Sequence, residues 1–360
     1  MKIAIDVRPV KAQRAGIGIY SQNLVSALSK IRDDEEYILL GDPDTSWSAL
    51  PSGPGFKTVT IEGHASLWHL RAAKLGRGVD VYHSPSSLFV PLLLRERAVV
   101  TVHDLVPFVM PEVSNTKTWW THRVFGLAVR QAGAIIAVSQ HTASDLRMVV
   151  PGLTTPVWSI HEAPRTDFFP RSNAGKTCTP YLLAVGTLEP RKNLATLLRA
   201  YRLAGRKDDS LPKLVVVGKL GWKNTEFEKC LADEWMKERV ELTGYVSDKR
   251  LRELFQEAQA FIYPSRYEGF GLPVLEAMAC GTPVITSTCS SLPEIGGNAA
   301  IYVDPHDEQE LSEAILRVQD PKIRRDLAAQ GIARASEFSW ETTARETRAV
   351  YQTVSASRRA

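Results

Sequence analysis

FIYPSRYEGFGLPVLE, residues 261–276, contains a short apolar run, a glycine-rich loop and the expected start of a helix. The apolar residues at its beginning predict a buried strand, and Pro273 is typical of the first turn of a helix. Glu268 lies in the loop and Glu276 in the first turn of the helix, with seven residues between them. A helix start presents free backbone N–H groups to an anion, and the two carboxylates can accept hydrogen bonds from neutral hydroxyls. A ligand with phosphates and many hydroxyls, such as a nucleotide sugar, therefore fits this stretch.

Two glutamates beside a Gly/Pro turn are, taken alone, more often a solvated surface with a charged helix start. The longer stretch PSRYEGFGLPVLEAMACGTPVI resembles, without a gap, the signature of retaining glycosyltransferases of family four, which have the two-domain GT-B fold. The resemblance implies that Glu276 accepts hydrogen bonds from the nucleotide ribose and that Glu268 lies near the donor sugar. It also implies that the sugar or its phosphate lies near the backbone amides of Phe270, Gly271 and Leu272.

Length and composition predict a soluble protein of two domains. A chain of 360 residues exceeds one typical core, and 44% hydrophobic with 23% charged residues argues against both disorder and a membrane span. Asp6 within the N-terminal strand argues against a signal peptide. Four widely separated cysteines predict a reduced, cytoplasmic protein without structural zinc. A net charge of +4 is too small to indicate a nucleic-acid partner.

Short apolar strands alternate with helical patterns, which predicts parallel sheets covered by helices on both faces. The expected strands form two sets of five, separated by the turn-rich segment 161–180. We therefore expect an α/β protein of two doubly wound Rossmann-like domains, residues 1–165 and 176–340. The family resemblance implies that a terminal helix, residues 341–360, returns to the first domain. The expected strands are residues 2–7, 37–41, 79–84, 98–104, 134–139, 181–187, 213–218, 239–246, 260–265 and 283–287.

Two features of the first domain point to a ligand site. Gly16 and Gly18 lie in a loop before an expected helix near Tyr20, where backbone can approach a phosphate or an acceptor. Because Gly-x-Gly-x-x-Ser lacks the third glycine of the dinucleotide fingerprint, a nicotinamide site is poorly supported. His103 ends an apolar strand at the carboxyl edge of its sheet, where ligands bind in open α/β sheets. A lone histidine is more often structural, but His103 with Asp104 matches the HD motif of the resembling family, which implies a role beside the donor sugar.

The second domain opens with YLLAVGTLEPRKNLATLL, in which Gly186 precedes Arg191 and Lys192. A basic pair at a helix start is unfavourable unless an anion compensates it, so we expect the pair to stabilise the diphosphate leaving group. The family usually has an arginine directly after the glycine. Thr187 stands there instead, and Arg191 or Arg266 are the candidate substitutes. The variant GTLEPRKN resembles a subgroup that builds bacterial surface polysaccharides, often with mannose or rhamnose.

The segment 113–131 is basic, aromatic and free of carboxylates. Such a stretch can lie on an anionic membrane surface, and it can equally be an ordinary domain helix with a solvated basic face. Its basic and aromatic residues are Lys117, Trp119, Trp120, Arg123, Phe125 and Arg130.

These features predict an enzyme, a retaining and metal-independent hexosyltransferase. It would move mannose or a similar hexose from GDP-mannose to a growing cell-surface glycan or a lipid-linked oligosaccharide, in the cytoplasm or at the inner face of the plasma membrane. The nucleotide sugar is expected as a substrate, with no cofactor, no metal ion and no nucleic acid. The resemblance implies that attack occurs on the face the leaving group departs from and that the leaving phosphate accepts the acceptor's proton.

Two other functions stay open. A non-catalytic nucleotide- or glycan-binding protein on a decayed transferase scaffold is supported by Thr187, and a GT-B sugar-nucleotide epimerase is disfavoured by the segment 113–131. His161 and Glu162 occur where members of the resembling family tend to have a glycine-containing loop, and the sequence assigns them no role.

Overall fold

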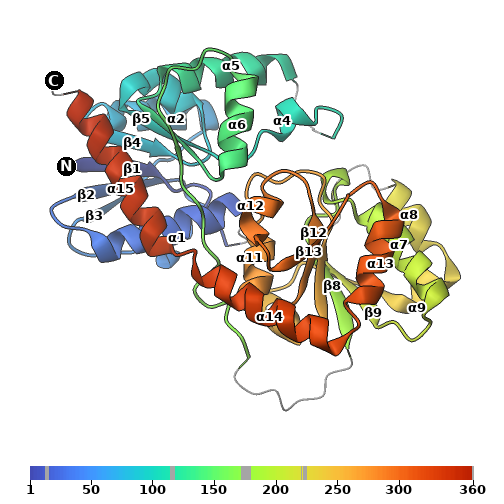
Figure 1. Ribbon diagram of the computed structural model, residues 1–360. Helices are drawn as coiled ribbons and strands as arrows, with labels where there is room; N and C mark the ends of the chain where they lie inside the picture. The colour runs from blue at the N-terminus through green and yellow to red at the C-terminus, as the bar shows by residue number, and fades with distance from the viewer. Residues whose placement is uncertain (13–15, 114–117, 172–179, 220, 222–224, 359–360) are drawn as a thin grey trace. The chain divides into compact units, whose positions relative to one another are not determined.

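The computed structural model describes residues 1–12, 16–113, 118–171, 180–219, 221 and 225–358, and in it the chain forms two compact units (Figure 1). The first unit comprises Met1–Glu162 together with Ser339–Ala360, and the second comprises Ala163–Phe338. Each unit is a parallel sheet with helices on both faces, which is the predicted Rossmann-like α/β architecture.

The sheet of the first unit has the strand order β3-β2-β1-β4-β5-β6-β7, and every neighbouring pair is parallel. Its central strands are fully buried runs of Val, Ile and Ala, as expected for a sheet covered on both faces. The strands are β1 (Lys2–Asp6), β2 (Glu36–Gly41), β3 (Phe56–Thr60), β4 (Val81–Ser84), β5 (Ala98–Val102), β6 (Ala134–Ala137) and β7 (Val157–Ser159). The helices are α1 (Gly16–Ile31), α2 (Ala65–Gly76), α3 (Phe89–Leu94), α4 (Val106–Val109), α5 (Thr118–Gln131), α6 (Gln140–Val149) and α15 (Trp340–Ser357), with short turns η1 (Trp47–Ala49) and η2 (Arg95–Arg97).

The sheet of the second unit has the order β10-β9-β8-β11-β12-β13 and is also parallel throughout. Its strands are β8 (Tyr181–Val185), β9 (Lys213–Val217), β10 (Val240–Gly244), β11 (Ala260–Tyr263), β12 (Val284–Ser287) and β13 (Ala300–Val303). Its helices are η3 (Pro190–Lys192), α7 (Leu194–Lys207), α8 (Thr225–Leu231), α9 (Glu234–Arg239), α10 (Asp248–Glu257), α11 (Leu272–Ala279), α12 (Leu292–Gly296), α13 (Glu308–Arg317) and α14 (Pro321–Ser336).

Two details of the predicted fold were wrong. The described sheets contain seven and six strands rather than five each, because β3, β7 and β13 were not predicted. Strand β3, FKTVT, is half exposed and lacks an apolar run, and β7 has three residues. The second error concerns Gly16 and Gly18, which lie in the first turn of α1 rather than in a loop.

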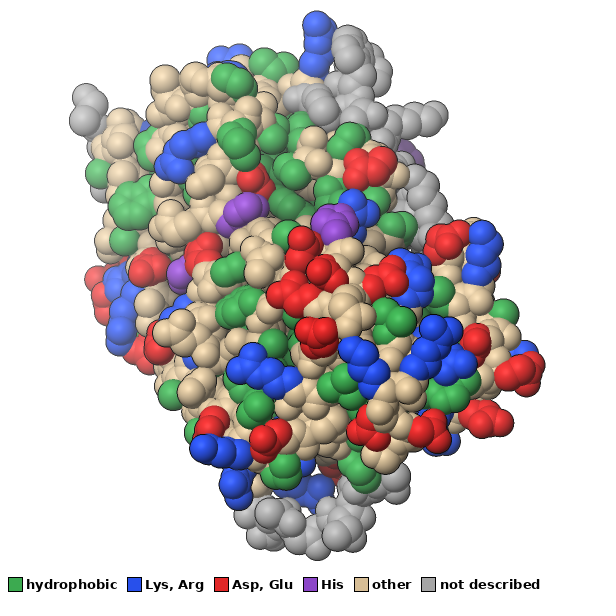
Figure 2. Space-filling model, turned by 45° about the vertical axis from the view of Figure 1, so that its right-hand side comes forward, with side chains coloured by type: hydrophobic (Ala, Val, Ile, Leu, Met, Phe, Trp, Pro, Cys, Tyr) green, Lys and Arg blue, Asp and Glu red, His purple; other side chains and the backbone are tan. Residues whose placement is uncertain are grey.

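The last helix, α15, belongs to the first unit and lies beside α1 (Figure 1). Tyr351 and Val350 of α15 are fully buried, and Arg348 forms ion pairs with Asp33 and Glu35 just before β2. Acidic and basic side chains are interspersed on the face shown in Figure 2, which accords with the small net charge.

Candidate active site

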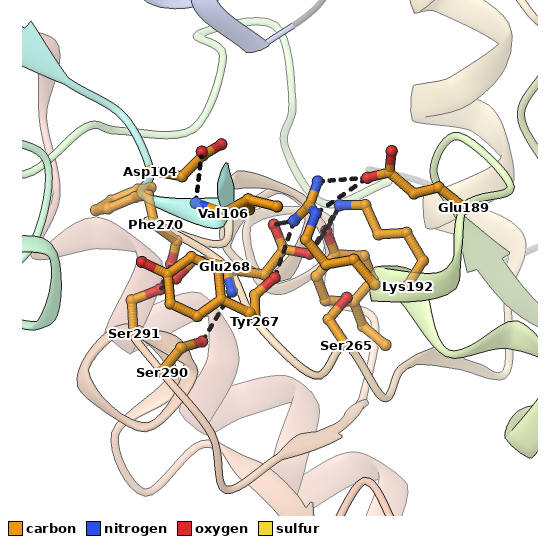
Figure 3. Close-up of polar contacts among 12 residues, drawn as sticks. Asp104, Val106, Glu189, Lys192, Ser265, Tyr267, Glu268, Phe270, Ser290 and Ser291 are labelled. Atoms are coloured by element: carbon orange, nitrogen blue, oxygen red, sulfur yellow. Dashed lines mark hydrogen bonds and ion pairs between the residues drawn. The ribbon is translucent and has the colours of Figure 1, made fainter. Parts of the chain in front are cut away.

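In the second unit, three charged side chains from two loops meet in one buried cluster. Strands β8 and β11 are parallel neighbours, so the segments that follow their carboxyl ends lie side by side. The Lys192 ammonium donates to Glu268 Oε1 at 2.7 Å, and Arg191 Nη1 donates to Glu268 Oε2 at 2.6 Å. The hydroxyl of Tyr263, at the end of β11, also donates to Glu268 Oε1 at 2.8 Å. Figure 3 shows Lys192 reaching Glu268 from the opposite loop.

The environment of Glu268 keeps its carboxylate ionised. The side chain is nearly buried, at 7% exposure, and burial alone raises the pKa of a carboxyl group. Arg191 and Lys192 outweigh that effect and lower the pKa of Glu268 to about 2. The Lys192 side chain is largely buried, at 11% exposure, and this desolvation together with the nearby Arg191 lowers its pKa, against the raising effect of Glu268. At neutral pH Glu268 is therefore an anion that orients two cations, and it has no proton to give.

The structure corrects the argument made for the basic pair. Arg191 and Lys192 lie in the 3₁₀ turn η3, and α7 begins two residues after Lys192, at Leu194, behind Asn193 in a left-handed conformation. Their compensating anions are carboxylates of the protein itself, since Arg191 also pairs with Glu189 at 2.7 Å. The positive charges of Arg191 and Lys192 are therefore compensated within the protein and do not by themselves require an external anion.

Glu276 belongs to a second charged network. Both of its oxygens accept hydrogen bonds from Arg165, from Nε at 2.6 Å and from Nη2 at 3.0 Å, and Arg165 Nη1 donates to Asp248 at 2.8 Å. Glu276 is 3% exposed, and its burial raises the pKa of the carboxyl group against the lowering effect of Arg165. A carboxylate has about four lone-pair positions, so two remain for other donors when Arg165 has taken two.

The loop between Glu268 and α11 is held by hydrogen bonds from a neighbouring segment. Ser291 Oγ donates to the carbonyl oxygens of Glu268 and Phe270, and the Glu268 N–H donates to Ser290 Oγ at 2.9 Å (Figure 3). Gly271 has φ = +105°, a backbone conformation that residues with side chains rarely adopt. It directly precedes Leu272, the first residue of α11. Both Phe270 and Leu272 have buried side chains, so what these residues offer a ligand is backbone.

The remaining predicted donor residues lie near the same edge of this sheet. Gly186 follows β8 and has φ = +147°. A Cβ added at Gly186 would lie 3.4 Å from Cε of the Lys192 side chain. Thr187 is exposed. Arg266 donates its backbone N–H to the Arg191 carbonyl at 2.9 Å, and its buried Nε has no hydrogen-bond partner among the described residues.

In the first unit, His103 directly follows β5, and its Nδ1 lies 3.1 Å from Glu162 Oε1. The ring of Tyr20, from α1, contacts it edge to face at 4.7 Å between centroids. The other ring nitrogen, Nε2, is buried without a hydrogen-bond partner among the residues that the structure describes. Gly16 and Gly18 occupy the start of α1, and a Cβ at Gly16 would meet no atom within 4 Å.

A pocket of about 590 Å³ opens at the carboxyl edge of the same sheet. Arg8 lies on the wall of this pocket, with its guanidinium carbon 3.4 Å from the centroid of the Trp68 ring. Its Nη2 and Nε donate to the Asp6 carboxylate at 2.7 and 3.0 Å, so the guanidinium is held in place. Phe89 is 54% exposed and gives the pocket an aromatic surface. The lining residues are Arg8, Pro9, Asp42, His69, Ser86, Ser87, Leu88, Phe89 and Val124.

Several of these residues were missed by sequence reasoning. Arg165 and Glu162 stand in a turn-rich stretch without a periodic pattern, and Asp248 opens an ordinary surface helix. The sequence also contains an Asp-x-Asp pattern, Asp42 and Asp44, which the metal prediction overlooked. Lys11 pairs with Asp42 at 2.5 Å and approaches Asp44 at 3.8 Å.

The described part of the chain has neither a cluster of metal-binding side chains nor a membrane-spanning helix. No group of three or more His, Cys, Asp or Glu side chains there could hold a metal ion. Among the same residues, no helix is long and apolar enough to cross a bilayer.

Known proteins resemble this chain over nearly its whole length. Residues 166–334 match the family model described as "Glycosyl transferases group 1". The O-antigen chain mannosyltransferase B of Escherichia coli is 32% identical, covering 98% of this chain and 100% of its own. Sucrose-phosphate synthase from Thermosynechococcus elongatus has a TM-score of 0.81 at 22% identity, covering 99% of this chain and 100% of its own. Anabaena Alr3699/HepE, solved with UDP and glucose, has a TM-score of 0.76 at 18% identity, covering 97% of this chain and 98% of its own.

Two parallel-sheet units of this topology, together with these relatives, place the chain in the GT-B class of glycosyltransferases. The chain belongs to the group 1 glycosyltransferase family. Structures related to it in fold have been solved with a nucleotide and a sugar bound.

Proposed function

We propose that this glycosyltransferase moves mannose from GDP-mannose to a growing cell-surface glycan or lipid-linked oligosaccharide, with retention and without a metal ion. The choice of mannose is supported by a full-length relative that is an O-antigen mannosyltransferase. The observation that carries the donor assignment is the buried cluster of Arg191, Lys192 and Glu268.

The donor diphosphate would be held by the cations of the second unit. Glu268 fixes the directions of Lys192 and Arg191 before substrate arrives, and preorganised charges of this kind are usually the largest electrostatic contribution to catalysis. An ammonium has three N–H donors, and Lys192 uses two of them, on Glu268 and Tyr263. The third donor of Lys192 would bind phosphate oxygens together with Arg266 Nε, which has no hydrogen-bond partner among the described residues. The two would substitute for the arginine that Thr187 replaces.

The nucleoside would be held by Glu276. Two of its lone-pair positions remain after the bidentate contact with Arg165, and neutral ribose hydroxyls are the donors that such a buried, already compensated carboxylate can accept. Arg165 would then orient the Glu276 carboxylate, just as Glu268 orients the Lys192 ammonium.

The acceptor glycan would occupy the pocket of the first unit. An exposed aromatic ring suits the apolar face of a pyranose, and the polar side chains of Asp42, His69 and Arg8 suit its hydroxyls. The pocket holds both kinds of surface, with Phe89 as the ring.

The protein is further proposed to work at an anionic membrane surface, where lipid-linked acceptors reside. Of the three aromatic side chains in segment 113–131, the structure describes one, and that one is buried. Phe125 of α5 is a core residue, only 6% exposed, and Lys117 and the side chains of Trp119 and Trp120 lie outside the described residues. The neighbouring α2 instead exposes apolar and basic side chains together, and no carboxylate occurs between Glu62 and Asp80. Its exposed residues include Leu67, Leu70, Arg71, Lys74 and Leu75.

The test is a panel of GDP-, UDP-, ADP- and dTDP-sugars, assayed for slow hydrolysis and for transfer to glycan acceptors, with and without EDTA. GDP-mannose should be turned over, EDTA should have no effect, and NMR of the product should show the anomeric configuration of the donor. Lys192→Ala should lower kcat about 10²- to 10³-fold, as for removal of one preorganised transition-state contact. Lys237→Ala, at an exposed lysine of α9, is the matched control and should keep full activity.

Other outcomes would change the proposed donor, the proposed mechanism or the proposed class of function. Turnover of a different nucleotide sugar would replace GDP-mannose, and inhibition by EDTA would contradict the metal-independent mechanism. Silence across the whole panel would favour a nucleotide- or glycan-binding protein on a transferase scaffold.

A further inference from the structure

Glu162, to which the sequence assigns no role, is a buried carboxylate, 5% exposed, at the end of the first unit. Among the described residues no lysine or arginine pairs with it. Its one side-chain partner there is His103, whose Nδ1 lies 3.1 Å from Oε1, within hydrogen-bond distance. Because an unpaired buried charge is strongly unfavourable, this single contact accounts for the position of both side chains.

The surrounding chain fixes both partners of the pair. Ile160 continues the β7 ladder by donating its N–H to the Ala137 carbonyl at 2.9 Å, and Thr343 of α15 donates to the His161 carbonyl at 2.7 Å. These two contacts hold the backbone of the two residues that directly precede Glu162. The imidazole of His103 is held by its place directly after β5 and by the edge of the Tyr20 ring.

The other titratable groups around the imidazole are neutral or point elsewhere. Burial raises the pKa of Tyr20 and is the largest cause that lowers the pKa of His83 to about 3, so both are neutral at pH 7. Asp104, the next residue in the chain, accepts a hydrogen bond from the Val106 N–H at 3.2 Å (Figure 3). Glu162 is therefore the charged group that decides where His103 keeps its proton.

We propose that Glu162 is a positioning residue that holds His103 as the Nδ1–H tautomer and so presents an unprotonated Nε2 to a sugar hydroxyl. Nε2 is buried and has no partner among the described residues, which marks it as a hydrogen-bond acceptor waiting for a donor. A neutral hydroxyl supplies such a donor, whereas a phosphate oxygen supplies none. The inference rests on the proposed transferase function only for the identity of that hydroxyl.

The experiment uses the full chain with ¹⁵N-labelled histidine. The chain has eight histidines, so the spectrum of His103→Asn identifies the His103 signals. The wild type should show a protonated Nδ1 and an unprotonated Nε2 at pH 8. In Glu162→Ala the tautomer preference should be lost. In Glu162→Gln the amide oxygen can still accept from Nδ1, so the tautomer should persist.

Kinetics provide the second readout. Glu162→Ala should lower kcat about 10- to 100-fold, the range seen when the hydrogen-bond partners of metal-ligating histidines are removed, and should change KM for the donor much less. Glu162→Gln should recover part of that loss. The matched control is Glu35→Gln, another buried glutamate of the first unit, which pairs with Arg348 at the opposite edge of the sheet. It should cost stability and leave kcat and the His103 signals unchanged.

A wild-type Nε2–H tautomer, or a Glu162→Ala variant with unchanged spectrum, would overturn the assignment. Unchanged kcat in Glu162→Ala, measured in a protein that transfers sugar, would overturn it as well. If no sugar nucleotide is turned over at all, the proposed function fails, and the NMR readout still decides whether Glu162 sets the tautomer.

Discussion

Glu268 illustrates how single residues in this site depend on their neighbours. Its charge is stabilised by two cations and a tyrosine hydroxyl that come from two loops, and none of these partners is within three residues of it in sequence. The arrangement contributes to stability as well as to the proposed chemistry, and the contribution to stability depends on pH.

The first prediction concerns the stability supplied by Glu268. Its pKa falls from an ordinary 4.5 to about 2 on folding, so the contribution is fully present above pH 4.5 and is lost as the pH falls toward 2. Glu268→Gln should therefore be less stable than the wild type at pH 7, by at most about 3 kcal/mol. In urea unfolding the difference should shrink steadily between pH 4.5 and 2.

Glu238→Gln, at an exposed position on α9, serves as the control and should show a small difference at every pH. A Glu268→Gln deficit that stays constant down to pH 2 would show that packing, and not the ionised carboxylate, makes the contribution.

At the scale of elements, α15 completes the first unit although it is the last helix in the chain. It packs along α1, and its Tyr351 hydroxyl meets the buried Nδ1 of His83 at 2.6 Å. His83 Nε2 in turn contacts Thr101 at 2.7 Å, so α15 is joined to the central strands β4 and β5 through a buried polar chain.

The second prediction compares two buried tyrosines of this unit. Tyr351→Phe removes a partner from a buried histidine and should cost about 1–3 kcal/mol of unfolding free energy. Tyr37→Phe removes a hydroxyl that has no hydrogen-bond partner among the described residues, and it should be neutral or slightly stabilising. Urea unfolding at pH 7 measures both. Equal losses would mean that the contact with His83 contributes nothing.

At the scale of the whole molecule, charges of both signs are mixed on the face in Figure 2, whereas α2 exposes leucines and cations without a carboxylate. A helix with that composition on its exposed face suits the boundary between lipid headgroups and acyl chains. The proposed work on lipid-linked acceptors would place this helix of the first unit on the membrane.

The third prediction tests that placement by flotation with vesicles. The protein should float with anionic vesicles at low salt, should float less as salt is added, and should not float with zwitterionic vesicles. Lys74→Ala should lower the partition coefficient about fivefold, which corresponds to about 1 kcal/mol per surface cation. Lys237→Ala in the second unit should leave it unchanged. Absence of flotation at low salt would rule the membrane proposal out.

The strands of both sheets were predictable because buried parallel strands are continuous runs of Val, Ile and Leu, which local sequence reveals. The same reasoning missed β3, whose exposed edge position tolerates polar residues. It also placed Gly16 and Gly18 in a loop, since glycines favour turns locally although α1 in fact starts there.

Family membership could be read from a few contiguous motifs. The residues of the proposed sugar-nucleotide site, Glu268, Glu276, Arg191 and Lys192, stand within the same short recognisable stretches. Their partners could not be read in this way. Arg165 reaches Glu276 across 111 positions, and Glu162 reaches His103 across 59. Ion pairs of this kind depend on which loops the parallel sheets bring to one edge, and the single residues that supply them leave no periodic trace in the chain.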